Sequence, residues 1–390
     1  MRRIIPMLLA VVLVLGSAAA AHADGIDVKV KGTWDFAFGW STNVGWANSN
    51  YHERKDRNDD SFIARSRVRT QINFITSEYL QGVLMFEIGD LDWGRGGTSG
   101  RGSGGGLDAD GVNVETKRAY IDWIIPETEV SVRMGIQGLK LPSGPLGSPV
   151  FDTDVSGIVV SSPITDMISV TGFWIRPFNQ YLNDSEVSGA FANSLDDEMD
   201  AFGLVLPITG DGWAVTPWGM YAFVGANSGF YDYLLSNGRN STNTNGNQDS
   251  TVGWWAGVNF ELTMFDPLKF TFDAMYGDLH KNDLSGLDMS KKDGLWWGTH
   301  PMETSVGTRG WFLAATLDYK LDWGTPGIFG WWGSGDSGNA DDTGQLGRMP
   351  VVSTDIGFQA TTFGALGSPN IATEGVVLGS GTGTWGVGLQ

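Results

Sequence analysis

The sequence predicts an all-β fold, a transmembrane antiparallel β-barrel, on the strength of three observations. Apolar and polar residues alternate with a period of two along most of the chain. The connections between the alternating segments are short and long in strict turn. Beyond residue 24 no window approaches about 18 consecutive apolar residues, so no membrane-spanning helix is expected.

The first alternating segment covers residues 26–40. Its even-numbered residues are mostly apolar, including Trp34 and Phe36, and its odd-numbered residues are mostly polar, including Lys29 and Asp35. Successive side chains of a strand point to opposite faces, so this segment is expected to have one apolar and one polar face. The same pattern predicts strands within residues 62–74, 81–88, 118–125, 129–137, 202–206, 256–262, 268–276 and 311–319.

The connections between these strands carry the clearest signal. Short turns are expected near residues 77–80, 126–129, 163–166, 209–212, 264–267 and 322–327. Long loops are expected near residues 41–61, 93–111, 139–152, 177–199, 225–250, 279–308 and 334–382. A membrane barrel has short turns at one end and long loops at the other, whereas a β-sandwich has no reason to keep this rhythm.

Residues 155–162 are the weakest predicted strand. Without this strand two long connections would follow one another and the rhythm would break. With it, the six short turns and seven long loops separate thirteen strands and the start of a fourteenth at residues 384–389.

The N-terminus predicts export. Arg2 and Arg3 precede an apolar run over residues 4–15, and Ala21-His22-Ala23 matches a signal-peptidase site. We therefore expect a signal peptide at residues 1–23 and a barrel domain at residues 24–390. The apolar run of twelve residues is too short to span a bilayer, which needs about 20.

Composition excludes several functional classes. The formal net charge of −19 argues against nucleic-acid binding, which needs clustered Lys and Arg. The absence of Cys excludes disulfide scaffolds, thiolate metal sites and thiol catalysis.

Three arginines on one face of one strand indicate which face meets water. Arg65, Arg67 and Arg69 would each cost roughly 2 to 4 kcal/mol if they faced lipid near the midplane. They are therefore expected to point into the water-filled interior of the barrel, although a solvated face of a soluble sheet is the alternative. The same reasoning places further charged residues on the inside, namely Glu87, Arg118, Asp122 and Arg133.

The third long loop, at residues 139–154, is rich in Pro and Gly and ends in Asp152 and Asp154. If it folds inward, these two acids would oppose the arginines across a narrowed pore and filter solutes by size and charge. An ordinary surface loop is the alternative.

These features resemble a known family. Four of them are similar to bacterial trimeric general porins: the signal peptide, the strand Arg65-Ser66-Arg67-Val68-Arg69, the segment Lys117-Arg118-Ala119-Tyr120-Ile121-Asp122, and the third loop. The Gly- and Trp-rich stretches at residues 139–158 and 323–336 more specifically resemble the homotrimeric porins of sulfate-reducing delta-proteobacteria.

The resemblance implies an outer-membrane barrel of sixteen strands, a homotrimer, and passive uptake of small hydrophilic solutes and ions. It also implies a constriction between third-loop acids and wall arginines. As partners we expect outer-membrane lipid and surface polysaccharide. One departure concerns the C-terminus: such barrels end in an aromatic residue, whereas this chain ends in Leu389 and Gln390. We expect either a truncated sequence or an unusual closure of the barrel.

Signals of enzymatic or cofactor chemistry are weak. Neither an HExxH zinc pair nor a G-x-S-x-G nucleophile elbow occurs, so we expect no enzyme and no cofactor. A weak calcium candidate lies at Asp108, Asp110 and Asn113, which lack the full spacing of an EF-hand.

Two further functions stay open beside the general porin. The first is a substrate-selective channel for sugars or anions, because Trp218, Trp255 and Trp332 could line a path for sugar rings. The second is a secreted β-sandwich that binds glycans or acts as an enzyme.

Overall fold

The structure is a computed structural model that describes residues 25–41, 61–94, 106, 114–144, 147–179, 198–225, 228, 250–283, 305–335, 345–347, 349–352, 383 and 385–390. The expected signal peptide and the calcium candidate Asp108, Asp110 and Asn113 lie outside these ranges. Within them, no helix is both long enough and apolar enough to cross a membrane.

All regular structure in the described residues is β-strand. The strands are β1 (Asp27–Ser41), β2 (Ser61–Ile75), β3 (Leu80–Asp92), β4 (Val114–Ile124), β5 (Ser131–Lys140), β6 (Asp152–Pro163), β7 (Ser169–Asn179), β8 (Glu198–Val205), β9 (Ile208–Gly210), β10 (Trp213–Val224), β11 (Thr251–Leu262), β12 (Leu268–Asp283), β13 (Ser305–Tyr319), β14 (Gly327–Gly333), β15 (Gln345–Leu346) and β16 (Trp385–Leu389).

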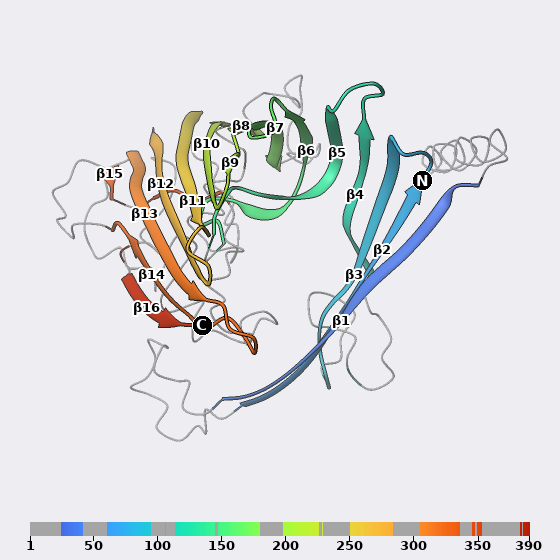
Figure 1. The fold of residues 1–390 in the computed structure, drawn as a ribbon, viewed down its shortest axis with the longest axis horizontal. Coiled ribbons are helices and arrows are strands. Elements are labelled where there is room, and N and C mark those ends of the chain that lie inside the picture. Colours follow the sequence, from blue (N-terminus) through green and yellow to red (C-terminus); the bar gives the residue numbers. More distant parts are fainter. Residues whose placement is uncertain are drawn as a thin grey trace, which may run out of the picture.

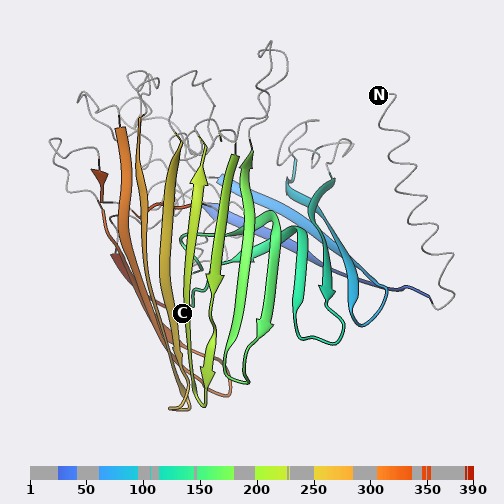
Figure 2. The same ribbon diagram turned by 90° about the horizontal axis from the view of Figure 1, so that it is seen from above.

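The strands form one sheet in which neighbours in sequence pair antiparallel (Figure 1). The path runs from β1 to β8, continues through β10 to β14, and ends at β16; β9 also pairs with β10, and the short β15 pairs parallel with β13. The short turns gather along one edge of the sheet (Figure 2). The all-β prediction is confirmed, and the weakest predicted strand, residues 155–162, is the body of β6.

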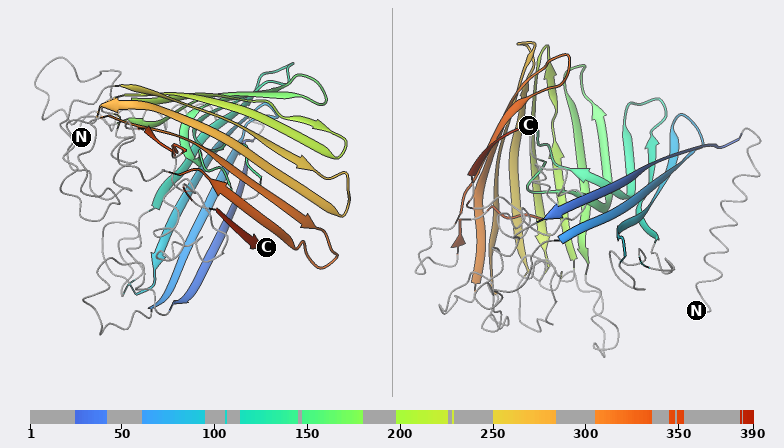
Figure 3. Two further views of the ribbon diagram at one scale, coloured as in Figure 1. Left: turned by 90° about the vertical axis from the view of Figure 1, so that its left-hand side faces the viewer. Right: turned by 90° about the horizontal axis from the view of Figure 1, so that it is seen from below.

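The sheet is strongly curved and open in the described residues (Figure 3). There β1 pairs with β2 alone and β16 with β14 alone. A single curved antiparallel sheet with a continuous path is not the pair of packed sheets that defines a sandwich.

The register of the ladders defines two faces. Residues directly opposite each other in an antiparallel pair place their side chains on the same face. The connection between β5 and β6, the third loop, crosses the concave side of the sheet (Figure 1). Its Ser143 donates to Asp273 of β12, so Asp273 lies on the concave face. We call this the inner face and the opposite one the outer face.

The outer face is largely apolar and exposed from β1 to β16, apart from an ionic group of Arg176, Glu198 and Asp200 on β7 and β8. Trp34 and Phe36 of β1 are 71% and 54% exposed, Phe223 of β10 is 54% exposed, and Trp385 of β16 is 76% exposed. Aromatic side chains on this face also contact one another, as Tyr276 does with Trp254 and Trp311. Strand alternation predicted this apolar face for residues such as Trp34, Phe36 and Trp311.

The inner face changes character along the sheet. From β1 to β5 it is largely polar, as alternation predicts. From β7 to β14 it is largely apolar and buried, with Trp218, Met220, Trp255, Met275 and Phe312 each at most 5% exposed. The expectation of a polar inner face is therefore wrong for this half, because apolar residues of the connections between strands cover it.

Candidate functional site

The polar part of the inner face spans β1 to β5. Cα partners connect it row by row: Asp35 of β1 lies opposite Arg67, Arg69 lies opposite Glu87, and Asp122 lies opposite Arg133. We call this surface the charged wall. Its charges are predicted from alternation, and the register brings them onto neighbouring strands.

The three arginines of β2 stand in a row on the charged wall. Arg69 donates from Nε to Oε2 of Glu87 at 2.6 Å, while Nε of Arg67 lies 3.7 Å from Oδ2 of Asp35. Arg65 lies in register with Ala37 of β1 and Asp92 of β3. Strands on both sides of β2 thus supply acids to this row.

Five charged side chains form the centre of the wall, and we call them the ionic cluster: Arg69, Glu87, Lys117, Arg118 and Asp154. Glu87 lies between Arg69 and Lys117, whose Nζ is 3.4 Å away. Asp154 lies 2.9 Å from Nζ of Lys117 and accepts from Nε of Arg118 at 2.7 Å. The cluster contains three bases and two acids from β2, β3, β4 and β6. It is linked continuously, with Glu87 only 4% exposed.

Lys117 is the member of this cluster that alternation missed. By parity it should lie on the face opposite Arg118. The β3–β4 ladder shifts register between Met85 and Phe86, where Met85 pairs with Arg118 and Phe86 with Thr116. This bulge leaves Lys117 as an extra residue, and a bulge re-aims the side chain that it carries. Lys117 and Arg118 therefore both contact the carboxylate of Asp154.

Arg118 reaches Asp154 across a place where β4 and β5 are no longer paired and β5 carries a glycine. The β4–β5 ladder ends at Ala119 and Ile136, and β5 continues paired only with β6. A Cβ atom at Gly138 would lie 2.6 Å from the Arg118 guanidinium, so the glycine permits this approach. The ion pair thereby joins β4 to β6 where the intervening hydrogen bonds stop.

Arg133 and Asp122 form a second pair toward the short-turn edge. Arg133 donates to both carboxylate oxygens of Asp122, at 2.6 and 3.1 Å, and lies over the ring of Tyr120 at 4.5 Å. Gln81 also donates to Asp122, at 3.1 Å. Two donors and a ring contact hold these side chains in one orientation.

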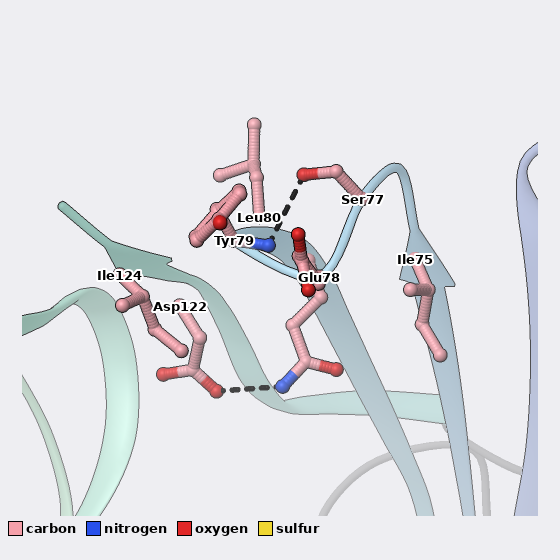
Figure 4. A pocket seen from close by; sticks show the side chains of 8 residues that line it. Ile75, Ser77, Glu78, Tyr79, Leu80, Asp122 and Ile124 are labelled. Atoms are coloured by element: carbon pink, nitrogen blue, oxygen red, sulfur yellow. Dashed lines mark hydrogen bonds between the residues drawn. The ribbon is translucent and has the colours of Figure 1, made fainter. Parts of the chain in front are cut away.

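A shallow pocket of about 210 Å³ lies beside this pair at the turn between β2 and β3 (Figure 4). Its lining includes Ile75, Glu78, Tyr79 and Asp122. A hydrogen bond to Glu78 and the charge of that residue raise the pKa of the exposed Tyr79 hydroxyl. The pocket is small and open, and it lies at the end of the charged wall that is next to the short turns.

The third loop crosses the inner face and reaches the far side of the sheet. The structure begins this loop after Lys140 and ends it before Asp152, so it is shorter than the predicted 139–154. Ser143 donates its hydroxyl to Oδ2 of Asp273 at 3.0 Å, and the Gly144 amide donates to the same carboxylate at 2.9 and 3.1 Å. Asn259 donates a further hydrogen bond to Asp273 at 2.6 Å.

The two acids expected at the end of the loop lie instead at the start of β6. Asp154 belongs to the ionic cluster, in direct contact with Arg118 and Lys117. Asp152 lies opposite Lys140 of β5, with Oδ2 3.4 Å from Nζ. Asp154 therefore contacts Arg118 and Lys117 of the charged wall directly, whereas Asp152 contacts Lys140 of the neighbouring strand β5.

The three tryptophans considered as a sugar path do not share one surface. Trp218 and Trp255 are buried on the inner face, at 5% and 1% exposure, whereas Trp332 is 45% exposed and lies opposite Trp385. A continuous aromatic track is therefore not formed by these residues.

One ionic group lies outside every sequence-based expectation. Arg176 of β7 donates to both oxygens of Asp200 at 2.9 and 2.8 Å and to Glu198 at 2.7 Å. Trp174 also donates to Asp200, at 2.9 Å. Asp200 lies opposite Phe223, whose side chain is on the outer face. Among the described residues, no group of three or more His, Asp or Glu side chains is arranged to hold a metal ion.

No protein-family model and no curated protein sequence matches the chain. Several solved structures are similar in outline. OmpF of Salmonella typhi in complex with daunomycin has a TM-score of 0.43 at 10% identity and covers 84% of each chain. The outer membrane channel DcaP of Acinetobacter baumannii has a TM-score of 0.40 at 12% identity and covers 81% of each chain.

OmpT, an outer membrane protein of Vibrio cholerae in its trimer form, has a TM-score of 0.38 at 10% identity and covers 83% of this chain and 95% of its own. Sequence identity to these structures is 10 to 12%.

Proposed function

We propose that the chain forms a water-filled outer-membrane channel through which small hydrophilic solutes and ions diffuse. The observation that carries this proposal is the distribution of side chains across the sheet. Exposed apolar residues occupy the outer face from Trp34 of β1 to Trp385 of β16, while charges occupy the inner face of β1 to β5. A soluble protein rarely exposes so continuous an apolar surface, whereas lipid covers it in a membrane barrel.

The charged wall is the proposed solute contact. Its members on β2 to β5 are Arg65, Arg67, Arg69, Glu87, Lys117, Arg118, Asp122 and Arg133. Two acids of β6 adjoin it: Asp154 contacts Lys117 and Arg118, and Asp152 lies beside Lys140 at the base of the third loop. Charged side chains that line a water-filled path select solutes by charge and size. No catalytic step and no cofactor form part of this proposal.

An anion-preferring channel is a second candidate within the same class. The ionic cluster has three bases against two acids, and the third base, Lys117, is placed there by the bulge in β4. A local excess of positive charge raises the concentration of anions near the wall.

We also propose three copies per assembly, in contact with outer-membrane lipid and surface polysaccharide. The exposed aromatic residues of the outer face support this, because aromatic side chains suit both the membrane interface and contacts between barrels.

Reconstitution in a planar bilayer tests the proposal. Purified folded protein is expected to produce discrete conductance steps, grouped in threes if the assembly is trimeric. The same preparation denatured by heat is the control. A folded β-protein that never conducts, in bilayers where a known porin does, would refute the channel.

A further inference from the structure

A second segment of the chain lies on the inner face, distant from the third loop in sequence. Residues 349–352, Met349-Pro350-Val351-Val352, belong to the long connection between β14 and β16. Met349, Val351 and Val352 are 2%, 5% and 2% exposed. Such burial is unusual for a connection at the long-loop end of a barrel, where loops normally meet water. We call these four residues the inner segment.

The inner segment is tied to the wall at its proline. The indole Nε1 of Trp255 donates a hydrogen bond to the carbonyl of Pro350 at 2.8 Å. Trp255 is itself only 1% exposed. A buried indole N–H needs an acceptor, so this bond fixes both the ring and the segment that covers it.

The inner segment is also tied to the third loop. The Val352 amide donates to the Val150 carbonyl at 3.0 Å. Val150 and Phe151 of the loop and Met349 and Val352 of the segment belong to one apolar cluster with Trp255. The two connections therefore pack as one unit over the apolar half of the inner face.

The approach of the segment is anchored before it enters the interior. Gln345 and Leu346 pair parallel with Gly307 and Thr308 of β13. The Ser334 hydroxyl then donates to the Gly347 carbonyl at 2.8 Å. The chain is thus held at the rim of β13 and β14 immediately ahead of the buried residues.

Gly277 of β12 provides the space that the segment occupies. A Cβ atom there would lie 2.5 Å from Cδ1 of Trp255 and 3.2 Å from Cδ of Pro350. Any larger residue would displace the ring or the proline.

We propose that the inner segment is a second constriction element, which together with the third loop closes the apolar half of the interior. Solutes then pass only along the charged wall of β1 to β5, so the segment sets the size of the path and confines it to charged surroundings. This inference rests on the proposed channel function. Its chemical basis is that the apolar side chains of the packed half cannot hydrogen-bond water or a polar solute, and that Asp273, a polar group of this half, is buried and already bonded to the third loop.

Trp255→Phe is the direct test, because it removes the donor to Pro350 and keeps an aromatic ring. Trp254→Phe is the matched control, since this neighbour is 37% exposed and lies on the outer face. In planar bilayers and in liposome-swelling assays with sugars of increasing size, Trp255→Phe is expected to raise single-channel conductance and admit larger sugars. Trp254→Phe is expected to match the parent protein.

Cysteine labelling provides a readout that does not depend on conductance. The natural chain has no Cys, so single substitutions report one site each. Val351→Cys is expected to react with a charged methanethiosulfonate reagent at least about tenfold more slowly than Thr33→Cys, which lies exposed on the inner face of β1. Adding Trp255→Phe to Val351→Cys is expected to remove much of this protection.

The outcomes separate the two proposals. If Val351→Cys reacts as fast as Thr33→Cys, or if Trp255→Phe changes neither labelling nor solute size, the inner segment is not a constriction element. If the parent protein does not conduct while Val351→Cys remains protected, the channel function fails and the buried position of the segment stands.

Discussion

Asp273 of β12 accepts a hydrogen bond at 2.9 Å from the backbone amide of Gly144, a residue 129 positions earlier in the chain. The carboxylate is fully buried and also accepts from Ser143 and Asn259. The Asp273 carboxylate therefore connects the third loop to β12, on the other side of the sheet from β5 and β6.

Replacing Asp273 with Ala is expected to release this loop. The Gly144 amide and the Asn259 side chain would lose their acceptor, while the Ser143 hydroxyl keeps the Gly147 carbonyl at 2.6 Å. Leaving a buried donor without a partner costs about 1 to 3 kcal/mol. The variant should unfold at lower urea concentration, and its third loop should become sensitive to protease. Asp211→Ala, in the exposed turn before β10, is the control and should behave as the parent. If the third loop of Asp273→Ala resists protease as well as that of the parent protein, the hydrogen bonds of Asp273 do not hold the loop in place.

Reversing the charge of Arg67 is expected to change ion preference. Arg67→Glu places a second acid beside Asp35 on the charged wall, so the reversal potential in a salt gradient should shift toward cations. Lys320→Glu makes the same charge change in an exposed turn and should shift it far less. Equal reversal potentials for Arg67→Glu and the parent would remove Arg67 from the solute path.

Lys117 can be tested with its neighbour Thr116, also on β4, as the control. Lys117→Ala should lower anion preference, because Glu87 and Asp154 would each lose a cation. Thr116→Ala changes an exposed residue that pairs with Phe86 and is expected to leave the reversal potential unchanged. If both variants behave alike, the bulge does not bring Lys117 to the wall.

The membrane contact of the outer face can be tested on β1. Phe36→Arg would place a charge against lipid and is expected to destabilise the protein in vesicles by about 2 to 4 kcal/mol near the midplane. Thr33→Arg, on the inner face of the same strand, should cost much less. Urea unfolding followed by tryptophan fluorescence measures both variants, and equal losses would argue against lipid at Phe36.

Much of the fold could be predicted because strand periodicity is local. Thirteen strands and the start of a fourteenth were expected, and the main path of the sheet follows them, including β6 at residues 152–163. The rhythm of connections was decisive for β6, whose own alternation is weak. The bulge that re-aims Lys117 was not predictable, since it depends on pairing with β3.

The sequence by itself determined the strands, their order, the apolar outer face and the charged wall, because each follows from neighbours one or two residues apart. The tertiary structure alone decided that Asp154 meets Arg118 and Lys117, that Asp273 holds the third loop, and that residues 349–352 cover Trp255. These contacts join residues tens to more than a hundred positions apart. No local period encodes such contacts. The packed apolar half of the interior therefore depends on how the third loop and residues 349–352 fold back against the sheet.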